Sequence, residues 1–112
     1  MVAPSAGAIV LVQFPFSDLS QAKLRPAIVL ADAGRGDHIL CQVTSNSYGD
    51  ATALRLEQSA FASGALMLVS YARPGKLFTA NSSLMVRQIA SLNHDAFRDV
   101  IEAVIKVIRG VP

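Results

Sequence analysis

The chain has a single cysteine and a low content of charged residues, 16%. One cysteine cannot form an intramolecular disulfide, and it also excludes the usual zinc sites built from several cysteines. The net charge of +2 does not demand a nucleic-acid partner, although it permits a local basic groove. The apolar runs are too short and too strand-like to cross a membrane. A stable fold must therefore come from a hydrophobic core.

The beginning of the chain lacks the features of a signal peptide. Residues 1–6 carry no basic side chain, and the apolar run that follows is short. We therefore expect a cytoplasmic protein. With 112 residues, of which 52% are hydrophobic, the chain can build one core without disulfides. No linker, repeat or low-complexity segment divides it, so we expect residues 1–112 to form a single domain.

Several common catalytic patterns are also missing. The sequence shows no paired carboxylates, no metal-ligand spacing, no glycine-rich phosphate loop and no serine–histidine–acid set. We therefore expect neither a metal nor another cofactor. Cys41 lies in an apolar segment and is expected to be buried and unreactive. His38 is expected in a loop or at a strand edge.

Short apolar segments separated by polar turns predict a mainly β fold. We expect strands where β-branched or alternating apolar side chains gather, at residues 9–16, 26–31, 38–45, 51–56, 66–71, 76–79 and 86–90. Residues 31–37 and 46–50 carry the glycine and polar residues of turns. Residues 57–64 fit either a loop or one helical turn. Short strands at this spacing favour a small barrel or sandwich.

The C-terminal part changes to helical periodicity. Apolar residues at intervals of three and four form one stripe, which consists of Phe97, Val100, Ile101, Val104, Ile105 and Ile108. Asn93 can cap the first turn, where Asp95 suits the helix dipole. The helix is expected to run to about Arg109, to end at Gly110 and to fold onto the barrel. The predicted class is therefore α+β, mainly β with a C-terminal α-helix.

Side chains that can bind phosphate occur in the expected loops and at strand ends. They are Lys23, Arg25, Thr44, Ser45, Arg73 and Lys76. Basic side chains neutralise phosphates, and hydroxyls donate hydrogen bonds to phosphate oxygens. Tyr48, in a polar turn, is a candidate for stacking on an unpaired base, whereas Phe14 and Phe16 are expected in the core. This pattern is typical of contacts to a nucleic-acid backbone.

Four motifs follow one another along the chain. They are Gly7-x-Ile9-Val10, the FPFSDLS segment at residues 14–20, Arg25-Pro26-Ala27-Ile28-Val29-Leu30, and Val43-Thr44-Ser45. In this order they resemble the toxins of the MazF/PemK (Kid) type from bacterial type II toxin–antitoxin pairs, over most of the chain. The resemblance implies a small SH3-like β-barrel of the MazF/PemK/CcdB type. It also implies a homodimer and a cognate antitoxin whose tail occupies the RNA groove.

The resemblance further implies a reaction. Toxins of this type are sequence-specific endoribonucleases that cleave single-stranded mRNA without a metal, through attack of the ribose 2′-hydroxyl on its own phosphate. By position, Arg25 and Thr44 are the main catalytic residues, and Arg73 matches a catalytic arginine of the Kid-like branch. Asp18 is the nearest carboxylate that can act as acid or base. We expect further RNA contacts from Lys23, Ser45, Ser20, Tyr48 and Lys76.

Three positions depart from the pattern of these toxins. Ala8 follows the opening glycine, where many members carry an acidic residue. Ser20 stands where some carry a glutamate, and Gly75 where the Kid-like branch has an aspartate. These changes remove carboxylates that could move protons but leave the phosphate-binding residues. The alternative function is a non-catalytic binding module on the same fold, acting on RNA or on a protein such as DNA gyrase, the target of the related CcdB toxins.

Overall fold

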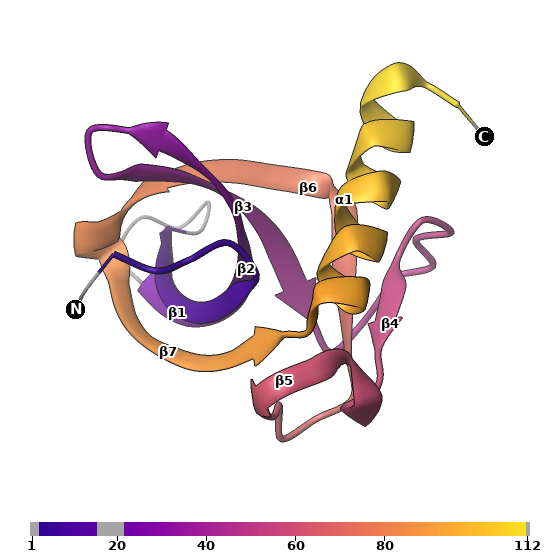
Figure 1. Ribbon diagram of the computed structural model, residues 1–112, viewed down its shortest axis with the longest axis horizontal. Coiled ribbons are helices and arrows are strands. Elements are labelled where there is room, and N and C mark those ends of the chain that lie inside the picture. Colours follow the sequence, from indigo (N-terminus) through magenta and orange to yellow (C-terminus); the bar gives the residue numbers. More distant parts are fainter. Residues whose placement is uncertain (1–2, 16–21, 112) are drawn as a thin grey trace.

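The computed structural model describes residues 3–15 and 22–111 and shows a curled antiparallel sheet with one C-terminal helix (Figure 1). The strands are β1 (Ala8–Pro15), β2 (Ala22–Gly34), β3 (Asp37–Thr44), β4 (Leu54–Leu56), β5 (Phe61–Gly64), β6 (Ser70–Asn81) and β7 (Met85–Leu92). The helix is α1 (His94–Arg109), and the short 3₁₀ helices are η1 (Gln58–Ala60) and η2 (Ser82–Leu84). The seven strands have the order β4-β6-β3-β2-β1-β7-β5. The predicted fold class, α+β and mainly β with a C-terminal α-helix, is confirmed.

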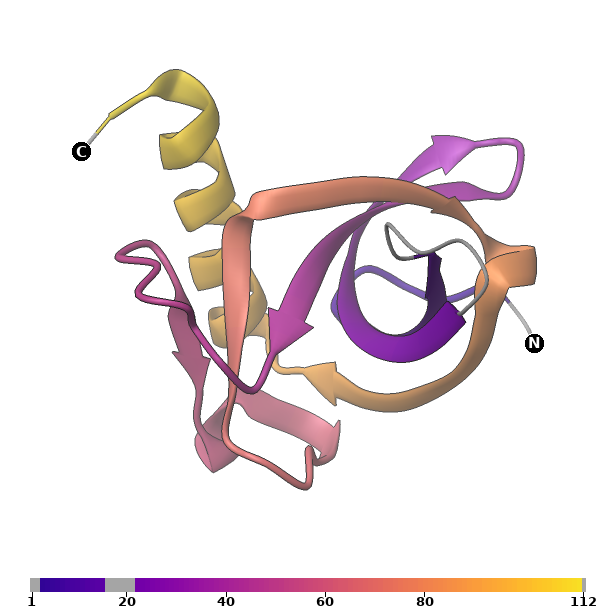
Figure 2. The same ribbon diagram turned by 180° about the vertical axis from the view of Figure 1, so that it is seen from behind.

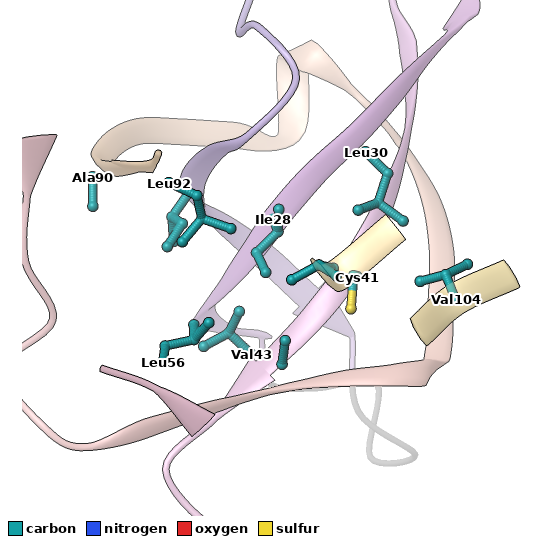
Figure 3. Close-up of a cluster of buried hydrophobic side chains, with 11 residues drawn as sticks. Ile28, Leu30, Cys41, Val43, Leu56, Ala90, Leu92 and Val104 are labelled. Carbon is teal, nitrogen blue, oxygen red and sulfur yellow. The ribbon is translucent and has the colours of Figure 1, made fainter. Parts of the chain in front are cut away.

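The middle of β2 is buried on both faces of the sheet. Successive side chains of a strand point to opposite faces, so Ile28 and Leu30 join one hydrophobic cluster while Ala27 and Val29 join another. The first cluster is closed by α1, whose Val104 lies beside Leu30 (Figure 3). Burial on both faces explains why this segment reads as a continuous apolar run.

A tight hairpin joins β2 and β3 within the predicted turn at residues 31–37, which is shorter than expected because β2 runs to Gly34 and β3 begins at Asp37. Arg35 and Gly36 have φ values of 58° and 80°, the left-handed conformation that a two-residue hairpin turn of type I′ requires. Gly34 and Asp37 pair across this turn. The hairpin sets the register that brings the beginning of β2 beside the end of β3.

The expected strands at residues 66–71 and 76–79 are wrong in their bounds. β6 is one long strand that begins at Ser70 and includes Arg73-Pro74-Gly75, and residues 65–69 lie outside any strand. β4 is likewise shorter than the expected strand at residues 51–56. The ambiguous residues 57–64 contain η1 and β5.

A bulge explains how proline fits inside β6. Cys41 pairs with Leu77, but Val43 pairs with Ala72, so residues 73–76 of β6 lie opposite Gln42 of β3. Proline has no N–H to donate to a neighbouring strand and is confined to edges and bulges. β6 bends sharply along its length (Figure 2). The bulge places both Arg73 and Lys76 beside the end of β3.

Cys41 and His38, both on β3, are buried, the first as expected and the second not. Cys41 is fully buried, and its thiol donates to the carbonyl oxygen of Arg73 at 3.2 Å. Burial raises the pKa of this thiol to about 12, so it stays protonated and unreactive at neutral pH. His38, expected in a loop or at an edge, is only 4% exposed. The expectation is wrong because His38 lies inside a strand that pairs with β2 on one side and with β6 on the other.

Helix α1 begins and ends as the sequence predicts. The Asn93 side chain accepts a hydrogen bond from the Ala96 N–H at 2.9 Å, which satisfies one unpaired donor of the first turn. Gly110 follows the helix with a φ of 71°, a conformation that glycine adopts without strain. Val100 and Val104 are buried against the sheet. Among the described residues, no helix has the length and apolarity to cross a membrane.

Candidate functional site

Arg25 and Thr44, the predicted catalytic pair, lie at the same edge of the sheet. β2 and β3 are neighbours, and their pairing reaches Ala27 opposite Gln42. Arg25 and Thr44 each lie two residues beyond that pair. Because side chains alternate along a strand, Arg25 shares the face of Ala27, and Thr44 shares that of Gln42. The fold therefore brings the guanidinium and the hydroxyl to one face, although they are far apart in the sequence.

A groove of about 350 Å³ opens at this edge of the sheet. Its polar lining includes Arg25, predicted as catalytic, and two predicted RNA contacts, Lys23 and Ser45. Its apolar lining includes Leu24 and Met67, which are 48% and 101% exposed. A groove with this mixture suits an extended anionic chain that also carries apolar groups.

The Thr44 hydroxyl is held at the end of β3. Its Oγ1 accepts a hydrogen bond from the Asn46 N–H at 3.1 Å, where the strand turns into the following loop. Thr44 is only 7% exposed, so the side chain is fixed by its surroundings. A hydroxyl that accepts one hydrogen bond still has its own proton to donate. Thr44 can therefore donate to a phosphate oxygen placed over this edge.

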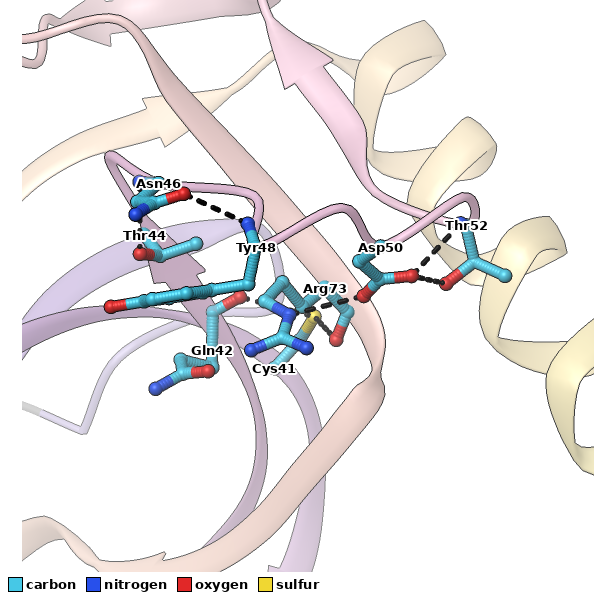
Figure 4. A network of polar contacts seen from close by, with 8 residues as sticks. All are labelled: Cys41, Gln42, Thr44, Asn46, Tyr48, Asp50, Thr52 and Arg73. Atoms are coloured by element: carbon cyan, nitrogen blue, oxygen red, sulfur yellow. Dashed lines mark hydrogen bonds and ion pairs between the residues drawn. The ribbon is translucent and has the colours of Figure 1, made fainter.

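Arg73 is held between a carboxylate and an aromatic ring (Figure 4). Its Nε donates to Asp50 Oδ2 at 3.0 Å, and both side chains are only 16% exposed. Its guanidinium carbon lies 5.5 Å from the centre of the Tyr48 ring, within the range of cation–π contact. Tyr48 has a φ of 54°, and it is exposed. The predicted turn at residues 46–50 thus positions Arg73.

Asp50 is a site residue that the sequence did not reveal. The resemblance to the Kid-like branch implies a carboxylate two residues after Arg73, where the chain has Gly75. The structure supplies that carboxylate from the loop after β3, 23 residues away in the sequence. The only local signal is the position of Asp50 in a polar turn, which is ordinary for aspartate.

Three donors stabilise the ionised form of Asp50. Thr52 donates to Oδ1 from its hydroxyl at 2.6 Å and from its N–H at 2.9 Å. These bonds, followed by the bond from Arg73, lower the pKa of Asp50 from 3.8 to about 2. The Asp50 carboxylate is therefore fully ionised at neutral pH.

The pKa shift of Asp50 predicts a pH dependence of stability. The pKa is lower in the folded state, so the stabilisation is complete above about pH 4 and is lost as the pH falls towards 2. We expect Asp50→Asn to lower the melting temperature at pH 6 and to have a much smaller effect at pH 2. Thermal melts of both proteins across this range measure the difference.

Asp99→Asn is the matched control for Asp50→Asn. Asp99 is an exposed carboxylate on α1, so the control melting temperature should follow that of the wild type at every pH. A gap between wild type and Asp50→Asn that stays the same from pH 6 to pH 2 would contradict the ion pair.

A second groove lies beside the bulge of β6. It has a volume of about 300 Å³ and is lined by Gln42, Lys76, Leu77 and Phe78. Among the described residues, nothing donates a hydrogen bond to the buried Oε1 of Gln42. An unsatisfied buried acceptor costs about 1–3 kcal/mol. The sequence pattern predicts Lys76 at the site but carries no signal for Gln42.

The predicted site residues fall into separate groups. Lys23, Arg25 and Ser45 share the first groove, and Lys76 lines the second. Thr44, Tyr48 and Arg73 lie close together in the view of Figure 4. Asp18, Ser20 and Phe16 lie outside the described residues, as does the Phe14 side chain. Among the described residues, no group of three or more His, Cys, Asp or Glu side chains forms a metal-binding cluster.

Comparison with known families gives one match in sequence. The family model described as PemK-like, MazF-like toxin of type II toxin–antitoxin system matches residues 5–108. No curated protein matches this chain significantly in sequence.

Solved structures show the same fold. MazF in a MazE–MazF crystal structure from Deinococcus radiodurans is 23% identical, with a TM-score of 0.74 and 100% of both chains covered. An endoribonuclease in complex with its cognate antitoxin, from a mycobacterial species, is 13% identical, with a TM-score of 0.72 over 100% of this chain and 98% of that one. The Mycobacterium tuberculosis toxin MazF-mt6 is 17% identical, with a TM-score of 0.70 over 94% and 98%.

Proposed function

We propose, because this chain belongs to the PemK-like, MazF-like toxins of type II toxin–antitoxin systems, that it is a sequence-specific endoribonuclease that cuts single-stranded mRNA. The observation that carries the proposal is the meeting of Arg25 and Thr44 at one edge and face of the sheet. Lys23 and Ser45 line the groove beside them. Together these groups can hold a phosphodiester at the place where the reaction needs positive charge and hydrogen-bond donors.

The proposed reaction uses the RNA's own nucleophile. The 2′-oxygen forms a bond to the adjacent phosphorus, and the bond from phosphorus to the 5′-oxygen breaks. The 2′-hydroxyl loses its proton to a base, and the leaving 5′-oxygen gains one, so the products are a cyclic phosphate and a 5′-hydroxyl. Charge builds up on the phosphate oxygens in the transition state. The Arg25 guanidinium and the Thr44 hydroxyl stabilise that charge, and no metal is needed.

Asp50 is better suited to positioning than to proton transfer. A carboxylate with a pKa of about 2 accepts a proton poorly at neutral pH. Its place against Arg73 instead fixes the direction of the guanidinium. Asp18 remains the proposed acid or base, and it lies outside the described residues.

A cognate antitoxin and a second copy of the chain complete the proposal. The first groove combines the cations Lys23 and Arg25 with apolar Leu24 and Met67, so an acidic peptide with apolar side chains would compete with RNA there.

Met67, Leu68 and Val69 expose apolar surface beside the groove, which favours burial in a homodimer. Light scattering of the purified protein measures the oligomeric state, and a monomer at all concentrations would contradict the dimer.

Incubation of the full chain with long single-stranded RNA in EDTA tests the proposal. We expect cuts at a short recurring motif in single-stranded RNA and none in the same sequence held as a duplex, because the reactive geometry is not accessible in a paired strand. Absence of cleavage across varied RNAs would contradict the enzyme and would favour the non-catalytic binding module.

A further inference from the structure

The bulge of β6 leaves the side chain of Gln42 beside an opening in the sheet. Gln42 pairs with Ala27 on β2 but has no pairing partner on β6. Residues 73–76 of β6 form a bulge opposite Gln42, because Pro74 has no N–H to donate to β3. Bulges often redirect side chains next to functional sites. Here the bulge separates Arg73, on one side of Gln42, from Lys76 on the other.

Three kinds of chemistry meet in the groove at this opening. Gln42 supplies a carboxamide, Phe78 an aromatic ring and Lys76 a cation, and the groove has a volume of about 300 Å³. This volume is at the lower end of the range for small-molecule pockets, about 300–1,000 Å³. Phe78 and Lys76 lie on β6, and Gln42 lies on the neighbouring β3.

The buried Oε1 of Gln42 needs a donor from outside the described residues. No described group donates to it, although a carboxamide oxygen can accept two hydrogen bonds. The Watson–Crick edge of an unpaired nucleobase offers an N–H donor beside an acceptor, which matches the carboxamide. An aromatic ring adds stacking, and a lysine neutralises the neighbouring phosphate.

The groove also lies next to the candidate catalytic residues. Gln42 shares its face of β3 with Thr44, and Figure 4 shows its side chain near the Tyr48 ring and the Arg73 guanidinium. A strand of RNA whose phosphate lies over Thr44 can therefore place a neighbouring base near Gln42.

We propose that Gln42, Phe78 and Lys76 form a nucleobase subsite in which Gln42 determines the base accepted at one position of the RNA motif. The subsite rests on the proposed RNA-cleaving function. Gln42 acts on binding and selection, whereas Arg25 and Thr44 act on the phosphate.

A binding selection separates the subsite from the chemistry. The full chain is mixed with a pool of random single-stranded RNA in which every ribose carries a 2′-fluoro group, so the nucleophile is absent and no strand can be cut. The retained strands are sequenced for wild type, Gln42→Leu, Gln42→Glu and the control Gln88→Leu, in which an exposed glutamine of β7 is changed. Cleavage of ordinary RNA by wild type is measured separately, so a failure of the enzyme is seen independently of the subsite.

We expect wild type and Gln88→Leu to share a base preference that Gln42→Leu loses at one position, by at least about fivefold. Gln42→Glu should shift the same position towards guanine, whose N1–H and N2–H groups both donate to a carboxylate. If Gln42→Leu melts well below wild type, the base preference of Gln42→Glu alone decides whether the subsite exists. The subsite would be overturned if the Gln42 variants keep the base preference of wild type, or if they lose binding equally for every RNA sequence. It would also be overturned if wild type shows no base preference.

Discussion

Arg25→Ala is expected to lower RNA cleavage by about 10³-fold, the effect of removing a principal stabiliser of transition-state charge. The expected cost in folding is small, less than about 1 kcal/mol, because charged side chains outside the core contribute little to stability. Arg25 is half-buried at the beginning of β2, beyond the fully buried Ala27. Cleavage rates and thermal melts of the same preparations measure both effects.

Arg98→Ala is the matched control for Arg25→Ala. Arg98 is 58% exposed on α1, which packs against the opposite face of the sheet from Arg25, so cleavage should stay close to wild type. A loss of stability in Arg25→Ala comparable with a core deletion, about 2–5 kcal/mol, would contradict the placement of Arg25 at the groove. Full activity of Arg25→Ala would contradict its catalytic role.

Thr44→Val is expected to lower the turnover rate by about 10²-fold with a smaller change in KM. Valine keeps the shape of the side chain but removes the hydroxyl that donates to the phosphate, and one such donor contributes about 10²–10³-fold to the rate. Single-turnover cleavage, with RNA binding measured separately, distinguishes the rate from the affinity.

Thr44→Ser tests whether the hydroxyl itself is responsible. Serine keeps both the donated proton and the oxygen that accepts from the Asn46 N–H, so its rate should stay within about tenfold of wild type. Because valine also leaves that N–H without its acceptor, the stability of both variants is measured. Equal inactivity of Thr44→Ser and Thr44→Val would show that the hydroxyl is not the important group.

The helix ends and the tight turn could be predicted from the sequence, because each depends on residues that are close together in the chain. Asn93 caps α1 and Gly110 ends it, because capping depends on residues within one turn. The tight turn at Arg35 and Gly36 follows from glycine in a polar segment between two apolar ones. The order of these elements was enough to predict the β class and the C-terminal helix.

Features that depend on long-range pairing could not be predicted in the same way. Arg-Pro-Gly at residues 73–75 is typical of an exposed turn, yet it lies inside β6, because pairing on both sides of a bulge keeps the strand intact. Asp50 meets Arg73 only because the end of β3 lies beside β6. The unsatisfied Gln42 oxygen has the same origin, since it depends on which residues of β6 face β3.

The most direct test of cleavage by 2′-hydroxyl attack uses two short RNAs that contain the mapped motif. They differ only in one 2′-deoxy sugar, on the 5′ side of the scissile phosphate, and are incubated with the full chain in EDTA. We predict that the all-ribose strand yields a 5′-hydroxyl fragment and a cyclic phosphate, and that the 2′-deoxy strand binds but remains intact. Cleavage of the 2′-deoxy strand, or a product with a 5′-phosphate, would contradict the mechanism.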